Sequence, residues 1–228
     1  MAIQNKEIQD LSADEIKEKA IGLAEKYKIW IYGFIFVVVG LGGGSYYYSN
    51  VIMANNNAEA DDELYKADQM MERDSFNLAL NGKDIMGQAG NFMGYIKIIE
   101  NYRGTRAANL AHYKAGVALL RIHQPQLAVE YLKNYSGDDE IQAQAYNLLG
   151  DAYSEIGDMS NAESNYKNAA GASDNVSIIL FANYKLAKLL EFQGKHEQAV
   201  DKFNEIISMD SEIAEQLGVD KDIIRLNK

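Results

Sequence analysis

The glycine-rich stretch VVVGLGGGSYYYSN, at residues 37–50, contains residues that a phosphate-binding loop would need. A dinucleotide-binding fingerprint requires G-x-G-x-x-G, but counting from Gly40 puts Ser45 where the third glycine belongs. A P-loop requires Lys followed by Ser or Thr after its last glycine, whereas Gly44 is followed by Ser45 and Tyr46. Neither pattern is complete, so we expect no nucleotide site here.

The other residues that could do chemistry are few and scattered. The three histidines, His112, His123 and His196, have no zinc-binding spacing. The chain has no cysteine, which excludes thiol catalysis, cysteine metal sites and disulfides. No G-x-S-x-G motif occurs, and no carboxylate pair stands out from the acidic background. We therefore predict that the protein is not an enzyme and has no catalytic, cofactor-binding or metal-binding residues.

The composition indicates a helical, acidic protein. The net charge is -11, from 33 acidic and 22 basic residues, so we expect no nucleic-acid partner. One proline and 15 tyrosines, with little alternation of Val and Thr, favour helices over strands. The length of 228 residues suits one sizeable domain with an appendage.

Residues 29–48 give the glycine-rich stretch a different interpretation. No charged residue occurs between Lys28 and Glu59. Twenty helical residues span about 30 Å, which is the hydrocarbon thickness of a bilayer. Aromatic residues stand at both ends, as in membrane interfaces. We predict a transmembrane helix, in which Gly40 and Gly44 form a G-x-x-x-G pair that either contacts another helix or simply lies in the lipid.

The first 28 residues are expected to form a helical cytoplasmic leader. A cleaved signal peptide is the alternative, but this leader is long and highly charged, and bulky tyrosines occupy the region where small residues would mark cleavage. Lys17, Lys19, Lys26 and Lys28 precede the span, and no Lys or Arg occurs at 49–65. The positive-inside rule then places residues 49–228 outside the cytoplasm.

Helical repeats are visible in the region that follows the span. The sequence AYNLLGDAYSEIGDMSNAESNYKNAAGASD, at residues 145–174, has the spacing of the tetratricopeptide (TPR) helix-turn-helix motif. Ala128 and Ala162 are 34 residues apart, which is the TPR period. A third unit has Ala199 at the matching position after three extra loop residues. We predict repeats at about 107–135, 141–171 and 178–208.

Less regular helices are expected on both sides of these repeats. Residues 57–73 and 92–102 predict a degenerate first pair, within 57–102, separated by a glycine-containing loop at 75–91. A helix at 211–227 would cap the stack. The predicted fold class is all-α, with one N-terminal transmembrane helix followed by a TPR-type α-solenoid domain at 49–228.

A groove is the functional surface that this architecture predicts. In a TPR stack, one face of each first helix lines the concave side. Tyrosines stand where carboxylate-gripping TPR proteins place lysines, so that clamp is absent. Mixed aromatic, aliphatic and charged groups favour apolar peptide segments of low specificity. Leu120 and Phe192 belong either to this face or to the core between repeats. The candidate groove residues are Tyr113, Val117, Arg121, Asn147, Asp151, Glu155, Tyr184 and Lys188.

The arrangement resembles the YfgM family. The segment IIENYRGTRAANLAHYKAGVALL, at residues 98–120, is similar to the part of that family that joins the first and second helical pairs. The resemblance covers residues 15–208, and the glycine-rich loop at 82–94 departs from it. It implies a single-pass protein of the bacterial inner membrane with a periplasmic domain. It also implies the SecYEG translocon and the membrane-bound chaperone PpiD as partners, and secreted polypeptides as clients.

Two hypotheses of different classes follow. The first is an ancillary chaperone or adaptor at the secretion channel. The second is a structural scaffold subunit of another cell-envelope complex, in which the repeats and Gly40/Gly44 simply join subunits.

Overall fold

The structure is a computed structural model that describes residues 13–83, 91–137 and 139–227. Residues 1–12 of the predicted leader lie outside this part. The chain divides into two compact units, Met1–Asn55 and Asn56–Lys228, and each is described by itself. We call residues 56–228 the repeat domain.

The N-terminal unit is helical throughout its described residues. Helix α2 (Ala13–Tyr47) is followed by the π-helix η1 (Tyr48–Ile52), after which α3 begins at Met53. The predicted leader and span therefore share one helix, because no proline or cap interrupts the chain at residue 28. Within it, Glu25–Tyr47 is long and apolar enough to cross a membrane, and none of its most apolar stretch is buried in the structure.

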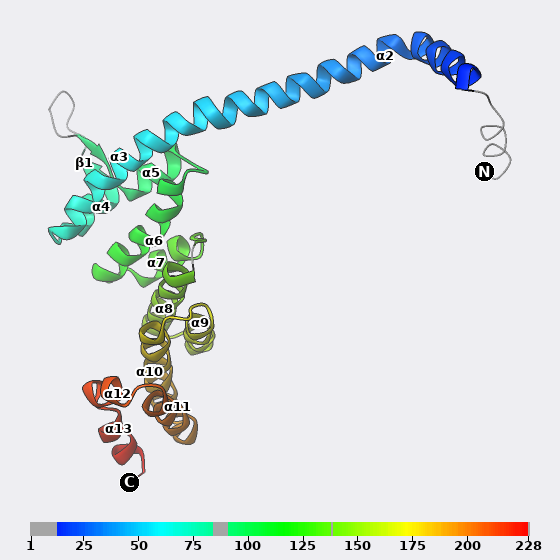
Figure 1. Cartoon of the computed structure of the whole chain (residues 1–228). Coiled ribbons are helices and arrows are strands. Elements are labelled where there is room, and N and C mark those ends of the chain that lie inside the picture. Colours follow the sequence, from blue (N-terminus) through cyan, green and yellow to red (C-terminus); the bar gives the residue numbers. More distant parts are fainter. Residues whose placement is uncertain (1–12, 84–90, 138, 228) are drawn as a thin grey trace. The chain divides into compact units, whose positions relative to one another are not determined.

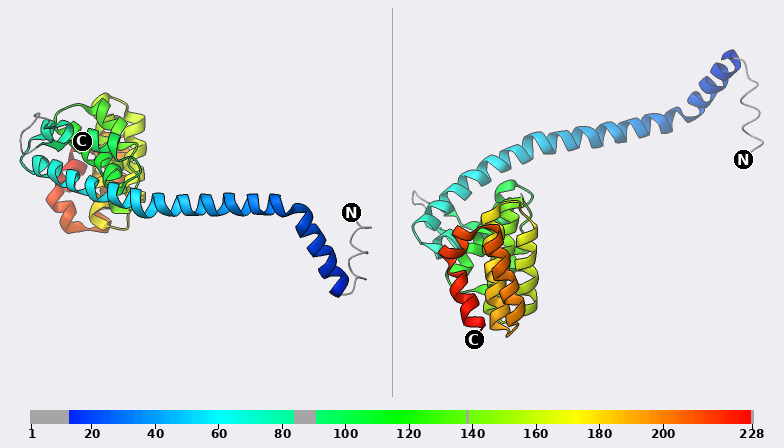
Figure 2. Two further views of the ribbon diagram at one scale, coloured as in Figure 1. Left: turned by 90° about the horizontal axis from the view of Figure 1, so that it is seen from above. Right: turned by 60° about the horizontal axis from the view of Figure 1, so that its bottom comes forward.

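Three helical pairs form the regular part of the repeat domain (Figure 1). In order they are α6 (Arg106–Arg121) with α7 (Pro125–Leu132), α8 (Asp139–Ile156) with α9 (Met159–Gly171), and α10 (Val176–Phe192) with α11 (His196–Met209). Helices α7 and α9 each pack on the first helix of their own pair and on that of the next, whereas α11 packs on α10 and on the two short helices that follow it; the stacked helices are seen in Figure 2. The prediction of an all-α repeat fold is confirmed, and the three pairs span residues 106–132, 139–171 and 176–209.

Small residues allow the two helices of each pair to cross closely. A Cβ atom built on Gly116 would lie 2.3 Å from Leu132, and one built on Gly150 would lie 2.4 Å from the Tyr166 ring. These separations are shorter than atomic contact permits, so both positions require glycine. On the second helices, alanine recurs at 128, 162 and 199, where each side chain is fully buried. The small residues of the TPR pattern thus mark the positions where the two helices of a pair cross.

The turn inside each pair uses a left-handed residue. Gly157 has φ 88° and Gly194 has φ 73°, and in the first pair His123 takes the matching place with φ 57°. Glycine adopts this conformation without steric cost, and non-glycine residues do so only rarely. His123 is therefore a turn residue rather than a ligand.

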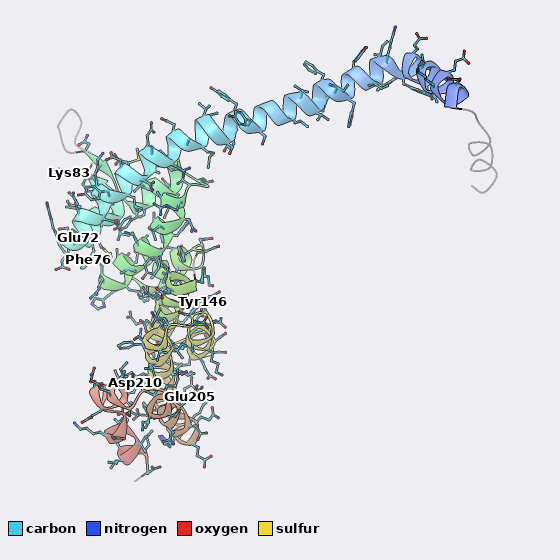
Figure 3. The ribbon with its side chains drawn as sticks, viewed as in Figure 1. Glu72, Phe76, Lys83, Tyr146, Glu205 and Asp210 are labelled. Atoms are coloured by element: carbon cyan, nitrogen blue, oxygen red, sulfur yellow. The ribbon has the colours of Figure 1, made fainter. Side chains whose placement is uncertain are left out.

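The degenerate pair differs from its prediction. This region contains helices α3 (Met53–Glu72), α4 (Phe76–Asn81) and α5 (Tyr95–Asn101). A short antiparallel ladder of β1 (Gly82–Lys83) and β2 (Phe92–Met93) comes between α4 and α5 in the chain. The loop predicted at 75–91 is wrong for its first part, because Ala79 and Leu80 are buried and hold a helical turn in the core. Figure 3 labels Glu72 and Phe76 on either side of the α3–α4 turn. Gly87 and Gly90 lie outside the described residues.

The second predicted helix of this pair is also shorter than expected. It begins at Tyr95 rather than at residue 92, because Phe92 and Met93 belong to β2. A Cβ atom on Gly94 would lie 2.3 Å from the carbonyl oxygen of Leu80, so the chain passes close to α4 before α5 starts.

The capping helix is broken in two. We predicted one helix at 211–227, but the chain forms α12 (Ser211–Leu217) and α13 (Val219–Leu226). Gly218 between them has φ 74°, a left-handed conformation that ends α12. The break allows Ala214 and Val219 to be buried together with the end of the stack.

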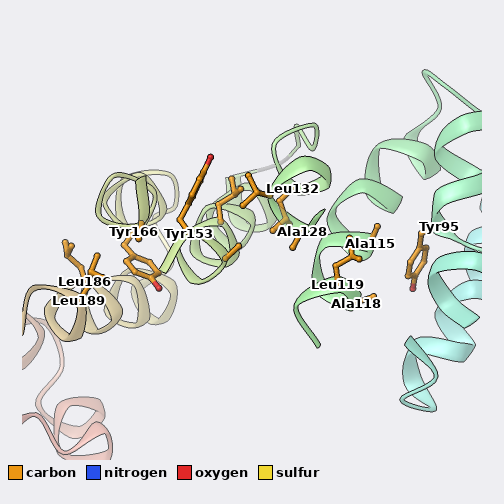
Figure 4. Close-up of a cluster of buried hydrophobic side chains, with 14 of the residues drawn as sticks. Tyr95, Ala115, Ala118, Leu119, Ala128, Leu132, Tyr153, Tyr166, Leu186 and Leu189 are labelled. Atoms are coloured by element: carbon orange, nitrogen blue, oxygen red, sulfur yellow. The ribbon is translucent and has the colours of Figure 1, made fainter. Parts of the chain in front are cut away.

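One hydrophobic core runs through the repeat domain. The side chains labelled in Figure 4 extend from Tyr95 on α5 to Leu186 and Leu189 on α10. A continuous core with contacts between neighbouring pairs is the basis of stability in repeat proteins.

Candidate functional site

Three adjoining pockets lie along the first helices α6, α8 and α10. The Asn147 pocket has a volume of about 320 Å³, the Arg121 pocket about 460 Å³ and the Phe192 pocket about 490 Å³. Leu148 borders the first two, Lys185 borders the first and third, and Glu155 borders the last two. We call the three pockets together the groove.

All of the candidate groove residues lie in these pockets. The Asn147 pocket contains Tyr113 and Asn147. The Arg121 pocket contains Val117, Arg121, Asp151 and Glu155. The Phe192 pocket contains Glu155, Tyr184 and Lys188. The repeat register therefore brings these side chains together in one row of pockets.

The Asn147 pocket combines an apolar lining with one unsatisfied amide. Leu148, Ile178 and Phe181 line it, and the Phe181 side chain is 51% exposed. Asn147 is 8% exposed, and its Oδ1 atom has no hydrogen-bond partner in the described part of the chain. A buried polar atom without a partner costs about 1–3 kcal/mol. This oxygen has less than 1 Å² of accessible surface, so its neighbours cover it in the structure.

The Arg121 pocket contains a carboxylate that is already paired with other side chains of the protein. Asp151 accepts a hydrogen bond from the Tyr166 hydroxyl at 2.8 Å. It also forms an ion pair with Lys185, whose Nζ atom lies 2.6 Å from the other carboxylate oxygen. Burial, and then the neighbouring Asp151 charge, raise the pKa of the Tyr166 hydroxyl well above its ordinary value. Asp151 therefore joins α8, α9 and α10, and its role is in the first place structural.

Lys188, in the Phe192 pocket, is likewise engaged. Its Nζ atom lies 2.8 Å from Glu191 and 3.3 Å from Asp222 on α13. Burial lowers the pKa of the Lys188 ammonium, but the two carboxylates outweigh it and raise the pKa overall. Lys188 thus connects the last repeat to the cap, while Phe192 beside it is 75% exposed.

The two predicted tyrosine anchors are partly committed to packing. The ring centroids of Tyr113 and Tyr135 lie 5.6 Å apart, and the Tyr113 hydroxyl donates a hydrogen bond to Gln144 at 3.0 Å. The Tyr184 ring lies 6.0 Å from that of Phe203. Leu120 is also partly buried against the core, whereas Phe192 is not. Of the two residues that the sequence left undecided, only Phe192 presents most of its surface.

Sequence reasoning missed Phe181 and Lys185. Phe181 precedes Tyr184 by three residues on α10, so it lies on the same helix face one turn earlier. Extending the groove face by one turn toward the N-terminus of α10 would have found it. Lys185 had no such signal, because its position depends on how α8 and α10 stack.

The other sequence candidates take structural places. His112 is half-buried on α6 against Tyr131, and burial lowers the pKa of its imidazole. Among the described residues, no group of three or more His, Asp or Glu side chains could hold a metal ion. Gly40 and Gly44 lie on α2, and a Cβ atom at either would meet nothing within 4 Å.

Comparisons with known proteins agree with the helical pairs. A family model described as tetratricopeptide repeat matches residues 143–175, which correspond to α8 and α9. The fold is that of a TPR protein. No curated protein sequence matches the chain.

Solved structures show the same fold at low identity. A crystal structure of MamA protein is 19% identical, with a TM-score of 0.51 over 74% of this chain and 87% of that one. A structure of nearly identical TPR-like repeats, from a candidate kinesin light chain of Podosopora anserina, is 12% identical. Its TM-score is 0.52, over 76% of this chain and 85% of that chain. TPR folds are typically non-catalytic interaction scaffolds, and the repeats indicate a role as a protein–protein adaptor.

Proposed function

We propose that this protein is a membrane-anchored adaptor and ancillary chaperone whose groove binds extended polypeptide segments. The observation that carries the proposal is the row of three adjoining pockets across α6, α8 and α10, whose lining is mostly apolar. An extended chain offers apolar side chains for the pockets and backbone polar groups for the polar side chains that line them. Folded partners rarely present both along one line.

The resemblance to the YfgM family supplies the cellular setting of this proposal. The domain would lie in the periplasm, anchored to the inner membrane by α2. It would assist polypeptides that emerge from the SecYEG translocon, together with a PpiD-like chaperone. Protease added to the periplasmic side should then digest residues 49–228 and leave about the first 50 residues protected. A C-terminus in the cytoplasm would contradict the orientation.

Site-specific photo-crosslinking tests the groove directly. A photoreactive amino acid replaces Phe181, which is 51% exposed in the Asn147 pocket. The matched control replaces Leu127, which is 42% exposed on α7 and lines none of the three pockets. Cells then express a secretory polypeptide arrested part-way through export. We expect adducts with the arrested chain from position 181 and not from position 127.

The scaffold hypothesis gives a different result in the same experiment. A scaffold would crosslink at either position to folded envelope subunits, and arrest of the secretory chain would change nothing. Equal crosslinking of the arrested chain from both positions would mean that the contact does not involve the groove. Either result would contradict the proposed function.

A further inference from the structure

Three residues at equivalent repeat positions differ in chemistry. Arg121 on α6, Glu155 on α8 and Phe192 on α10 follow one another at intervals of 34 and 37 residues, in register with the Gly116, Gly150 and Ala187 crossing points. Each stands within the last two residues of its helix, and each is exposed. Neighbouring first helices contact each other directly, so the three side chains form a row along the groove.

The two charges in this row are unpaired. Arg121 and Glu155 line the same pocket of about 460 Å³, yet within the described ranges neither has a salt-bridge partner closer than 4 Å. The other charges of the groove are satisfied internally, Asp151 by Lys185 and Lys188 by Glu191 and Asp222. Arg121 and Glu155 are thus the charges that the groove offers to an occupant.

The aromatic end of the row is equally open. Phe192 is 75% exposed and lines its pocket together with Lys188 and the buried Leu189. Exposed aromatic rings with an adjacent pocket are frequent anchors in protein interfaces. Phe192 could pack against a bulky apolar side chain without displacing any core residue.

We propose that the groove selects extended segments that carry an acidic, a basic and a bulky apolar side chain in that order. The acidic side chain would pair with Arg121, the basic one with Glu155, and the apolar one would pack on Phe192. Helix axes in contact lie about 8–10 Å apart, and an extended chain rises about 3.3 Å per residue. The selected side chains are therefore expected about three residues apart. This inference rests on the proposed function, because it assumes that a chain lies along the groove.

Labelled peptides of one composition test the order. The first has Asp, Lys and Phe separated by pairs of serines. The second has the same residues in the reverse sequence, because the proposal allows the peptide to lie along the groove in either direction. The two scrambled controls place Asp between Lys and Phe, in either direction. Binding to the full chain in lipid nanodiscs is measured by fluorescence anisotropy. We expect one of the first two peptides to bind at least about fivefold more tightly than either control, as an ion pair worth about 1 kcal/mol would give.

Exchanging the protein charges provides the matching test. The double substitution Arg121→Glu with Glu155→Arg should transfer the preference to a control peptide with Asp in the middle, and 0.5 M salt should weaken both preferences. Phe192→Ala should weaken the preferred peptide without changing the charge order. Asp201→Lys, an exposed charge reversal on α11 outside the three pockets, is the control and should change neither preference. Circular dichroism verifies that each variant is folded.

The outcomes separate this inference from the proposed function. If the arrested secretory chain crosslinks at position 181 but all four peptides bind equally, the groove binds polypeptides without reading their charge, and the inference is wrong. It is also wrong if the exchanged variant keeps the original preference. If the arrested chain does not crosslink at position 181, the proposed function itself fails, whichever peptides bind.

Discussion

The ammonium nitrogen of Lys185 on α10 lies 2.6 Å from a carboxylate oxygen of Asp151 on α8, and the same contact joins Lys114 to Asp68 at 2.5 Å. Lys114 and Lys185 occupy equivalent positions two repeats apart. In both places a tyrosine of the intervening helix donates its hydroxyl to the same carboxylate: Tyr166 to Asp151, and Tyr95 to Asp68. The same polar arrangement therefore joins the helices at two of the junctions between repeats.

The junction between these two is apolar instead. Val117, Leu132 and Leu148 occupy the positions that correspond to Asp151, Tyr166 and Lys185. A buried or half-buried ion pair contributes little net stability, because desolvation offsets its attraction, but a single unpaired member is costly. The chain thus uses two alternative solutions to one packing problem.

A three-residue exchange tests this equivalence. Asp151→Val alone removes the acceptor of both Tyr166 and Lys185, so we expect a loss of about 1–3 kcal/mol in the free energy of unfolding. Asp151→Val with Tyr166→Leu and Lys185→Leu copies the middle junction and should recover most of that loss. Urea unfolding followed by circular dichroism measures both. A triple variant that is less stable than the single variant would show that the two junctions are not interchangeable.

Alkaline pH should destabilise the domain through its buried tyrosines. Burial, and then Asp151, raise the pKa of Tyr166 above its unfolded value of 10.0. Above pH 10 the unfolded chain loses this proton while the folded chain retains it, so stability falls by up to about 1.4 kcal/mol per pH unit for this group. Below pH 10 both states keep the proton, and the hydroxyl contributes no pH dependence.

The matching measurement compares two tyrosine-to-phenylalanine variants between pH 9 and 12. Tyr166→Phe should make the decline in stability shallower by about one proton. Tyr65→Phe removes a side chain that is 63% exposed and serves as the control. Identical slopes for both variants would contradict the assignment of the effect to Tyr166.

The crossing of α8 and α9 should tolerate nothing larger than glycine at position 150. A methyl group there would approach the Tyr166 ring to 2.4 Å, and the ring is held by its bond to Asp151. We expect Gly150→Ala to be destabilising, by about 1–3 kcal/mol, although alanine favours a helix by about 1 kcal/mol. Gly171→Ala is the control, because a methyl group there meets nothing within 4 Å. If thermal unfolding ranks the two variants equally, the crossing is looser than the structure shows.

The sequence predicted the repeats well because their constraints are local. Gly150 and Ala162 are small where two helices must cross, and the spacing between such residues defines a pair and its register. The same register predicted the groove positions, since i, i+3 and i+4 side chains share a helix face. The Phe181 position could have been predicted by the same rule.

What the sequence did not predict depends on contacts between distant residues. The helix at 76–81 forms because Ala79 and Leu80 fit the core beside α5 and α6. Six residues are too few to show a helical periodicity in the sequence. The engagement of Lys188 by Asp222 follows from the placement of α13, which required the break at Gly218. The spacing of residue types along the chain does not show which distant residues come into contact.

The last prediction concerns the apolar helix α2. Gly40 and Gly44 lie one turn apart on α2, and a Cβ atom at either has open space around it, so a second helix could approach that face closely. Leucine at both positions favours membrane insertion but keeps a partner helix at a distance. We expect Gly40→Leu with Gly44→Leu to insert normally and to reduce co-purification of membrane partners in mild detergent. Gly42→Leu is the control, because position 42 lies on the opposite face of the helix from Gly40 and Gly44. Undiminished recovery of partners from the first variant would assign their binding to the repeat domain alone.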